Sequence, residues 1–291
     1  MALDTLRLPG GTVLDYWVGG PSEAGDLLIL HVGTPCAALP DPVVIDAAAR
    51  RGIRTASYSR PGYAGSTRKP GRTIADEAVN ATALADHLGV DRFFVVGWSG
   101  GGAPSLACAA LLPERVRSCV VVAGLAPPAE IEEDWLAWHP LEDRDSWRSY
   151  SGPITDALIA EYEESAAAIA VASGDEMAEG PPSEAEAFRR HPEGFEATAA
   201  QLRAGVAGGI WGMADDMHAW ANPWGFRVAD IEVPVTVRHG TADENAPVEH
   251  GRWLAGHIPG ANAQIIDDLA HLSIGYPFEP VIESLLNTDV Q

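Results

Sequence analysis

Long hydrophobic runs are missing from this 291-residue sequence. Apolar stretches such as 27–30, 106–112 and 120–126 fall well short of the roughly 18 residues that a membrane-spanning helix needs. The first residues also lack the basic segment and following apolar segment of a secretory leader. The sequence therefore argues against a membrane protein, and we expect a cytoplasmic one.

Cysteine is scarce as well. The three cysteines, Cys36, Cys108 and Cys119, are odd in number and follow neither a Cys-x-x-Cys nor a Cys/His spacing. This set predicts reduced thiols and argues against a disulfide framework and against a zinc site.

Basic residues are few, because 19 Lys and Arg stand against 41 Asp and Glu, which gives a formal net charge of −22. Such a negative surface repels phosphate backbones and anionic lipid headgroups, so we expect no nucleic-acid or membrane partner. Hydrophobic residues make up 46% of the chain, which is typical of a globular protein rather than a disordered one. The expected partner is a small-molecule substrate, and the expected state is a monomer or homodimer.

Short apolar segments alternate with longer helical ones over the first 126 residues. Segments 27–30, 93–96 and 120–122 are apolar at every position, as in parallel strands that are covered on both faces. Such alternation predicts a parallel sheet with right-handed crossovers. The expected strands are 12–18, 27–31, 55–59, 93–96, 119–123, 235–239 and 263–266, and the expected helices are 42–51, 74–88, 99–112, 247–257 and 277–286.

The alternation stops at Pro127 and resumes near Val233. The segment between them is acidic, is predicted to be helical, and holds six of the nine tryptophans. We interpret it as an insertion that covers the site of a single α/β domain, rather than as a second domain, because the same alternation returns after it. The predicted organisation is a core in two parts, 1–126 and 231–291, with a helical cap at 127–230.

Residues 97–101, Gly-Trp-Ser-Gly-Gly, match the G-x-S-x-G nucleophile elbow. The motif alone is weak, but here it follows an all-apolar strand and opens a helix. A turn this tight brings strand and helix backbones together, so a Cβ at Gly97 or Gly101 would collide with its surroundings. Ser99 is the predicted nucleophile.

A serine nucleophile needs a base and a third group that orients the base. In this arrangement the acid and then the histidine follow the serine along the chain, each after a later strand. Asp243 follows the predicted strand 235–239, and His271 follows 263–266. Glu244 is the rival of Asp243.

Two backbone N–H groups must stabilise the oxyanion of a tetrahedral intermediate. Gly100 directly follows the nucleophile, and Thr34 lies in the loop after the strand 27–31. Pro35 has no N–H and can only brace this loop. His31 is expected to fix the loop by a hydrogen bond rather than to act in catalysis.

Five blocks together resemble the α/β-hydrolase superfamily, in particular its small capped esterase-like and aminopeptidase-like members. The blocks are 31–35, 59–66, 97–101, 240–243 and 270–272. The resemblance implies a mostly parallel sheet of about eight strands with helices on both faces, and a helical cap after the sixth strand. It also implies a triad of Ser99, Asp243 and His271, without metal or organic cofactor. One departure is His31-Val32-Gly33, where an unbroken His-Gly is common in the family.

We therefore predict a serine hydrolase that forms an acyl-enzyme. An ester of a small or medium apolar acid is the favoured substrate, because a tryptophan-rich cap supplies an apolar wall. The tryptophans expected at the cleft are Trp135, Trp138, Trp211 and Trp220, although they could instead only pin the cap to the core.

Two other functions stay open at this point. In an aminopeptidase, cap carboxylates such as Asp215, Asp216 or Glu133 would hold a substrate amine; the first two are expected instead to cap a helix. In a lyase or cyclase the same scaffold would serve non-hydrolytic chemistry. Arg60, in the block 59–66, is expected to brace its loop rather than to contact substrate.

Overall fold

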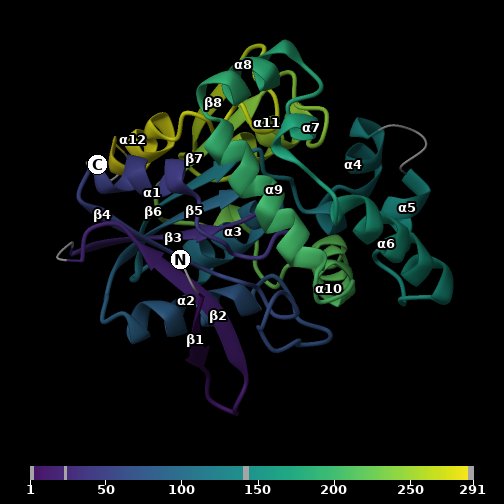
Figure 1. The fold of residues 1–291 in the computed structure, drawn as a ribbon, viewed down its shortest axis with the longest axis horizontal. Helices are drawn as coiled ribbons and strands as arrows, with labels where there is room; N and C mark the ends of the chain where they lie inside the picture. The colour runs from purple at the N-terminus through teal and green to yellow at the C-terminus, as the bar shows by residue number, and fades with distance from the viewer. Residues whose placement is uncertain (1–2, 23–24, 140–143, 288–291) are drawn as a thin grey trace.

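The computed structural model of the chain describes residues 3–22, 25–139 and 144–287 and contains an eight-stranded sheet. The strands lie in the order β1-β2-β4-β3-β5-β6-β7-β8 (Figure 1). Their bounds are β1 Asp4–Arg7, β2 Val13–Gly19, β3 Asp26–His31, β4 Ile53–Tyr58, β5 Phe93–Trp98, β6 Val116–Val122, β7 Val235–Gly240 and β8 Asn262–Ile266. β2 is antiparallel to β1 and to β4, and the other neighbours are parallel. The predicted α/β class with its mostly parallel sheet is confirmed.

Helices cover both faces of the sheet. Consecutive residues of a strand point to opposite faces, so each strand contributes side chains to both cores. In β5, Phe93 and Val95 belong to the apolar core under α2, α3 and α11, whereas Phe94 and Val96 belong to the core under α1 and α12. The bounds of these helices are α1 Pro42–Ala49, α2 Asp76–His87, α3 Gly102–Leu111, α11 Val248–His257 and α12 Glu279–Asn287. Burial on both faces is the reason why β5 is apolar throughout.

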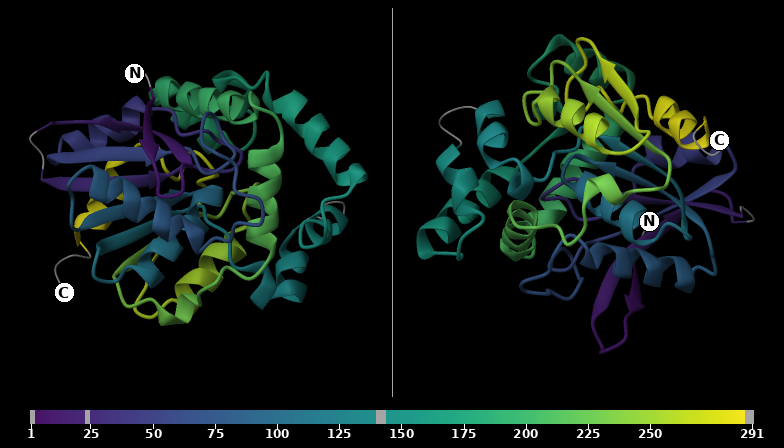
Figure 2. Two further views of the ribbon diagram at one scale, coloured as in Figure 1. Left: turned by 90° about the horizontal axis from the view of Figure 1, so that it is seen from below. Right: turned by 180° about the vertical axis from the view of Figure 1, so that it is seen from behind.

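Helices fill the long connection between β6 and β7, and its described part adds no strand to the sheet. They are η2 Pro128–Glu130, α4 Glu132–Trp138, α5 Arg144–Ser149, α6 Asp156–Ile169, α7 Gly174–Met177, α8 Pro182–Arg190, α9 Pro192–Val206, α10 Trp211–Ala221 and η4 Val228–Asp230. α9 and α10 lie nearer the sheet, and α4, α5 and α6 lie on the outer side (Figures 1 and 2). We call this connection the helical insertion.

The carboxyl ends of the parallel strands lie along one edge of the sheet. β3 ends at His31, β5 at Trp98 and β7 at Gly240, so the loops after these strands meet there. The strand that sequence reasoning missed is β1, whose four residues bury only Leu6 and so show no apolar pattern. None of the helices in the described ranges is both long and apolar enough to cross a membrane.

Candidate active site

Ser99 lies at a strained turn between β5 and α3. Its φ is 53°, in the left-handed region where residues with a Cβ are rarely found. The turn is held tight by its glycines. A Cβ at Gly97 would overlap the carbonyl of Gly101, and a Cβ at Gly101 would overlap the carbonyl of His31. The close approaches expected for these two glycines are therefore present in the structure.

Asp243 and His271 form a hydrogen-bonded pair. Nδ1 of His271 lies 2.9 Å from Oδ2 and 3.0 Å from Oδ1 of Asp243. Oδ1 also accepts backbone hydrogen bonds from Asn245 at 3.0 Å and Ala246 at 2.8 Å, which fix the carboxylate in its loop. The rival Glu244 is exposed, and among the described residues no hydrogen bond joins it to His271.

The pair is polarised by its surroundings. Burial disfavours the charged form of both groups, but their mutual attraction and hydrogen bond outweigh it. As a result the pKa of the Asp243 carboxyl lies below its usual range, and the pKa of the His271 imidazole lies above 6.5. An imidazole held in this way has Nε2 available for a proton from a neighbouring group.

A cavity of about 370 Å³ brings Ser99 and His271 together. Thr34 and Gly100 line the same cavity. Among the described side chains no hydrogen bond joins Ser99 to His271, and such bonds often tighten only when substrate is bound. The cavity therefore unites the predicted nucleophile, the predicted base and both predicted oxyanion donors.

The backbones of Gly100 and Thr34 lie against each other. A Cβ at Gly100 would stand 2.5 Å from Oγ1 and 2.9 Å from Cβ of Thr34, and 3.0 Å from its backbone nitrogen, so glycine is required at this approach. His31 is buried in the core, where its Nε2 lies 3.7 Å from Sγ of Cys108. Burial lowers the pKa of His31 to about 3, so this imidazole stays neutral and cannot act as an acid near pH 7.

Arg60 holds the loop that contains Thr34. Its guanidinium donates to the carbonyl of Val32 at 2.6 Å and to the carbonyl of Gly33 at 3.0 Å. It also donates to Oγ1 of Thr34 at 3.1 Å, and to both carboxylate oxygens of Asp216 in α10. The side chain of Arg60 is only 2% exposed. Arg60 therefore braces a loop, but it is the loop after β3 and not the expected one, and the partner carboxylate comes from the helical insertion.

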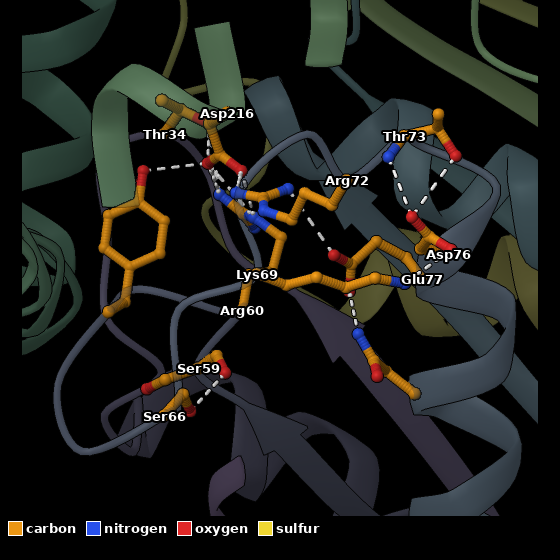
Figure 3. A network of polar contacts seen from close by, with 12 residues as sticks. Thr34, Ser59, Arg60, Ser66, Lys69, Arg72, Thr73, Asp76, Glu77 and Asp216 are labelled. Carbon is orange, nitrogen blue, oxygen red and sulfur yellow. Dashed lines mark hydrogen bonds and ion pairs between the residues drawn. The ribbon is translucent and has the colours of Figure 1, made fainter. Parts of the chain in front are cut away.

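Asp216 is the centre of this buried network (Figure 3). It pairs with Arg72 as well as Arg60, and it accepts a hydrogen bond from the hydroxyl of Tyr63 at 2.8 Å. Arg72 lies 3.5 Å from Glu77, so two arginines face two carboxylates. Burial opposes ionisation of Asp216, but both guanidinium groups hold its pKa well below its usual range. The carboxylate is therefore charged at neutral pH.

The expectation that Asp215 and Asp216 cap a helix is wrong. Both lie in the middle of α10, and both pair with arginines that precede α2 in the chain. Asp215 pairs with Arg68 at 2.7 Å. The third candidate for binding an amine, Glu133, is exposed on α4. Both aspartates of α10 are thus already paired with guanidinium groups.

Of the four tryptophans expected at the cleft, the described cavity lining includes Trp220. Trp147 and Trp98, which were not predicted there, line the cavity as well. The structure places Trp135 in the core, where its indole donates to the carbonyl of Ala126 at 3.1 Å.

The other two tryptophans also lie elsewhere. Trp138 packs edge-on against His250, with ring centroids 5.0 Å apart. Trp211 is 39% exposed and stacks on the guanidinium of Arg68. The expectation that Trp135, Trp138 and Trp211 line the cleft is corrected, because core packing and a surface arginine occupy their rings.

Glu184 of α8 is a buried group that sequence reasoning missed. Its carboxylate accepts backbone hydrogen bonds from Leu272 and Ser273, directly after His271. Local sequence carries no signal of this contact, because α8 contains a second glutamate, the half-exposed Glu186, two positions further on. Only the tertiary structure distinguishes Glu184 from its neighbour Glu186.

Comparison with known proteins agrees with the fold. Residues 26–146 match the family model described as the alpha/beta hydrolase fold. An uncharacterized hydrolase, YcgS, of Bacillus subtilis is 27% identical over 135 residues, which are 46% of this chain and 43% of that protein. The chain spans less than half the length of the curated relatives that it matches.

Solved structures match over nearly the whole chain. A hydrolase from Pseudomonas aeruginosa is 25% identical with a TM-score of 0.67, and the match covers 98% of each chain. The esterase RhEst1 from a Rhodococcus species is 19% identical with a TM-score of 0.69, and the match covers 100% of this chain and 99% of that one. The sheet, the family match over residues 26–146 and these structures together show that the chain has the α/β-hydrolase fold.

Proposed function

We propose that the protein is a serine hydrolase that cleaves a carboxylic ester with a small or medium apolar acyl group. The observation that carries this proposal is the cavity at which Ser99, the paired His271 and the Gly100–Thr34 contact meet. A nucleophile, an oriented base and adjacent N–H donors are the groups that acyl transfer requires.

In the proposed reaction the Ser99 hydroxyl attacks the ester carbonyl while Nε2 of His271 takes its proton. Asp243 holds Nδ1 and stabilises the imidazolium that forms. His271 then returns the proton to the leaving alkoxide as the acyl-enzyme forms. A water molecule repeats the sequence against the acyl-enzyme and releases the acid and free Ser99.

The negative oxygen of each tetrahedral intermediate would be held by the backbone N–H groups of Gly100 and Thr34. These donors are useful only if they are fixed before the charge develops. Arg60 supports this requirement, since it binds the carbonyls of Val32 and Gly33 directly before Thr34. Every step uses groups of the chain itself, without metal or organic cofactor.

An ester fits the cavity better than a peptide with a free amine. An aminopeptidase needs a carboxylate that is free to bind the substrate ammonium, and Asp215 and Asp216 are paired with arginines. Apolar side chains, among them Leu125, Met217 and Trp220, make up much of the cavity wall and suit an acyl chain.

We further propose that residues 127–230 act as a cap over this site. Trp147 of α5 and Met217 of α10 line the cavity, although both belong to the helical insertion. A cap of this kind shields the site from bulk solvent, admits the water that hydrolyses the acyl-enzyme, and gives the acyl group its apolar wall.

A substrate panel tests the proposed function. p-Nitrophenyl esters of increasing acyl length would be compared with amino-acid anilides, with and without a serine-directed fluorophosphonate. We expect turnover of the esters, complete inhibition by the fluorophosphonate, and covalent labelling that is lost in Ser99→Ala. Preferred turnover of anilides would favour an amidase, and labelling of Ser99 without turnover of either series would favour non-hydrolytic chemistry.

A further inference from the structure

Glu184 connects the helical insertion to the loop of His271. Its Oε1 accepts a hydrogen bond from the backbone N–H of Leu272, and its Oε2 accepts one from Ser273, both at 2.8 Å. The residue is 5% exposed and lies 88 positions before Leu272 in the chain. Burial raises the pKa of this carboxyl above its usual value, whereas the two N–H donors stabilise the carboxylate form and fix its orientation.

The segment after His271 depends on this carboxylate. Leu272 and Ser273 are buried, at 7% and 4% exposure, so their N–H groups would lack a partner without Glu184. On the other side of the loop, the indole of Trp98 donates to the carbonyl of His271 at 3.1 Å. The backbone at and directly after His271 is thus held by β5 through one carbonyl and by α8 through two N–H groups.

Glu184 also acts on His271 through its charge. The titratable groups that face the imidazole are Asp243 and His239 from the β7 side and Glu184 from α8. Burial lowers the pKa of His239, so this second imidazole is neutral. The negative charges of Asp243 and, to a smaller extent, Glu184 favour the protonated form of His271.

We propose that Glu184 is a positioning residue for His271, which fixes the backbone next to the imidazole and keeps a negative charge beside it. The proposal rests on the proposed role of His271 as the base. It assigns the helical insertion a part in the reaction beyond enclosing the substrate: α8 sets the position of the base and stabilises the imidazolium that forms when Ser99 gives up its proton.

Two variants separate the charge of Glu184 from its reach. Glu184→Gln removes the charge and replaces one acceptor by a donor. Glu184→Asp keeps the charge, but its side chain is one methylene shorter and cannot reach both N–H groups. Glu186→Gln is the matched control, because it makes the same charge change on the same helix at a half-exposed side chain that pairs with Arg189 and Arg190.

The first measurement is the NMR titration of the His271 imidazole, whose signal is assigned by its absence in His271→Asn. We expect the midpoint to fall by about 0.5–1 pH unit in Glu184→Gln and to stay unchanged in Glu186→Gln. This titration needs no substrate. A downward shift in a protein that hydrolyses no ester would support the charge effect of Glu184 while contradicting the proposed function.

The second measurement is the pH dependence of kcat/KM for the best ester of the panel. In Glu184→Gln we expect the acid limb to move down with the NMR midpoint and kcat to fall about tenfold or more, with KM little changed. In Glu184→Asp kcat should also fall, but the midpoint of the acid limb should move less than half as far as in Glu184→Gln. Wild-type midpoints and kcat in both variants would overturn the proposal, as would loss of folding in Glu184→Gln combined with wild-type kcat in Glu184→Asp.

Discussion

The hydroxyl of Thr34 donates a hydrogen bond to Oδ2 of Asp216 at 2.7 Å, although the two residues stand 182 positions apart in the chain. The bond joins the loop after β3 to α10 of the helical insertion. The same hydroxyl accepts from Arg60 at 3.1 Å, so Thr34 is held on two sides. A residue proposed to give its backbone N–H to the oxyanion is thus fixed through its side chain.

Removing this hydroxyl should slow the reaction with little effect on substrate binding. In Thr34→Val the loop loses both side-chain contacts, and we expect kcat to fall about tenfold to a hundredfold, because a misplaced oxyanion donor acts mainly on the transition state. Thr34→Ser keeps the hydroxyl and serves as the control. Steady-state kinetics with one ester would compare them; equal kcat values in the two variants would contradict the role of the hydroxyl.

Charge removal at Asp216 should destabilise the protein far more than charge removal at Asp215. Asp216→Asn leaves the buried Arg60 and Arg72 without a carboxylate between them, and loss of one partner of a buried ion pair costs about 3–5 kcal/mol. Asp215→Asn loses one pair with Arg68, whose side chain is 33% exposed and can be solvated by water instead, so the cost should be smaller. Urea unfolding gives both free energies, and similar losses in the two variants would contradict this ranking.

Activity should rise with pH through the ionisation of His271. The imidazole must be neutral to take the Ser99 proton. Burial lowers its pKa, but the charge of Asp243 and the hydrogen bond to it outweigh burial and raise the pKa above 6.5. We therefore expect the acid limb of kcat/KM to have its midpoint above pH 6.5. A profile between pH 5 and 9 on folded protein would reveal it, and a flat profile or a midpoint below 6.5 would exclude His271 as the base.

The same ionisation affects stability in the opposite direction. Because the folded-state pKa of His271 lies above its unfolded value, its pair with Asp243 adds stability below the unfolded pKa, and this contribution is lost as the pH rises through the folded pKa. We expect the difference in unfolding free energy between wild type and His271→Asn to shrink over that range. A difference that grows with pH would contradict the assignment of the charge to this pair.

Selectivity for longer acyl groups should depend on Trp220. Its ring lines the cavity, so Trp220→Ala should lower kcat/KM for long apolar esters by about tenfold or more, since each buried methylene is worth about 0.8 kcal/mol. Acetate esters should change less because they do not reach the ring. Trp211→Ala, at an exposed ring outside this lining, is the control. Equal losses for short and long esters would show that Trp220 acts only in packing.

The residues that could be predicted from the sequence each follow a strand directly. Ser99, Asp243 and His271 have short local signals, because the end of a parallel strand fixes where the next few residues lie. No strand end fixes the positions of residues in the helical insertion. Nothing local separates Asp216 from Asp215, or Glu184 from Glu186, and their roles depend on arginines and N–H groups far away in the chain. Trp147 and Trp135 both lie on short helices, and only packing decides which ring lines the cavity.

The buried charges around Asp216 have a further consequence for protein engineering. A chimera that received a foreign insertion without a carboxylate at this position would leave the buried Arg60 without a carboxylate partner and the buried Arg72 with Glu77 alone. Positions 60, 72 and 216 must therefore change together or not at all. Recombination at the two ends of the insertion would separate Asp216 from Arg60 and Arg72, although the three side chains form one network.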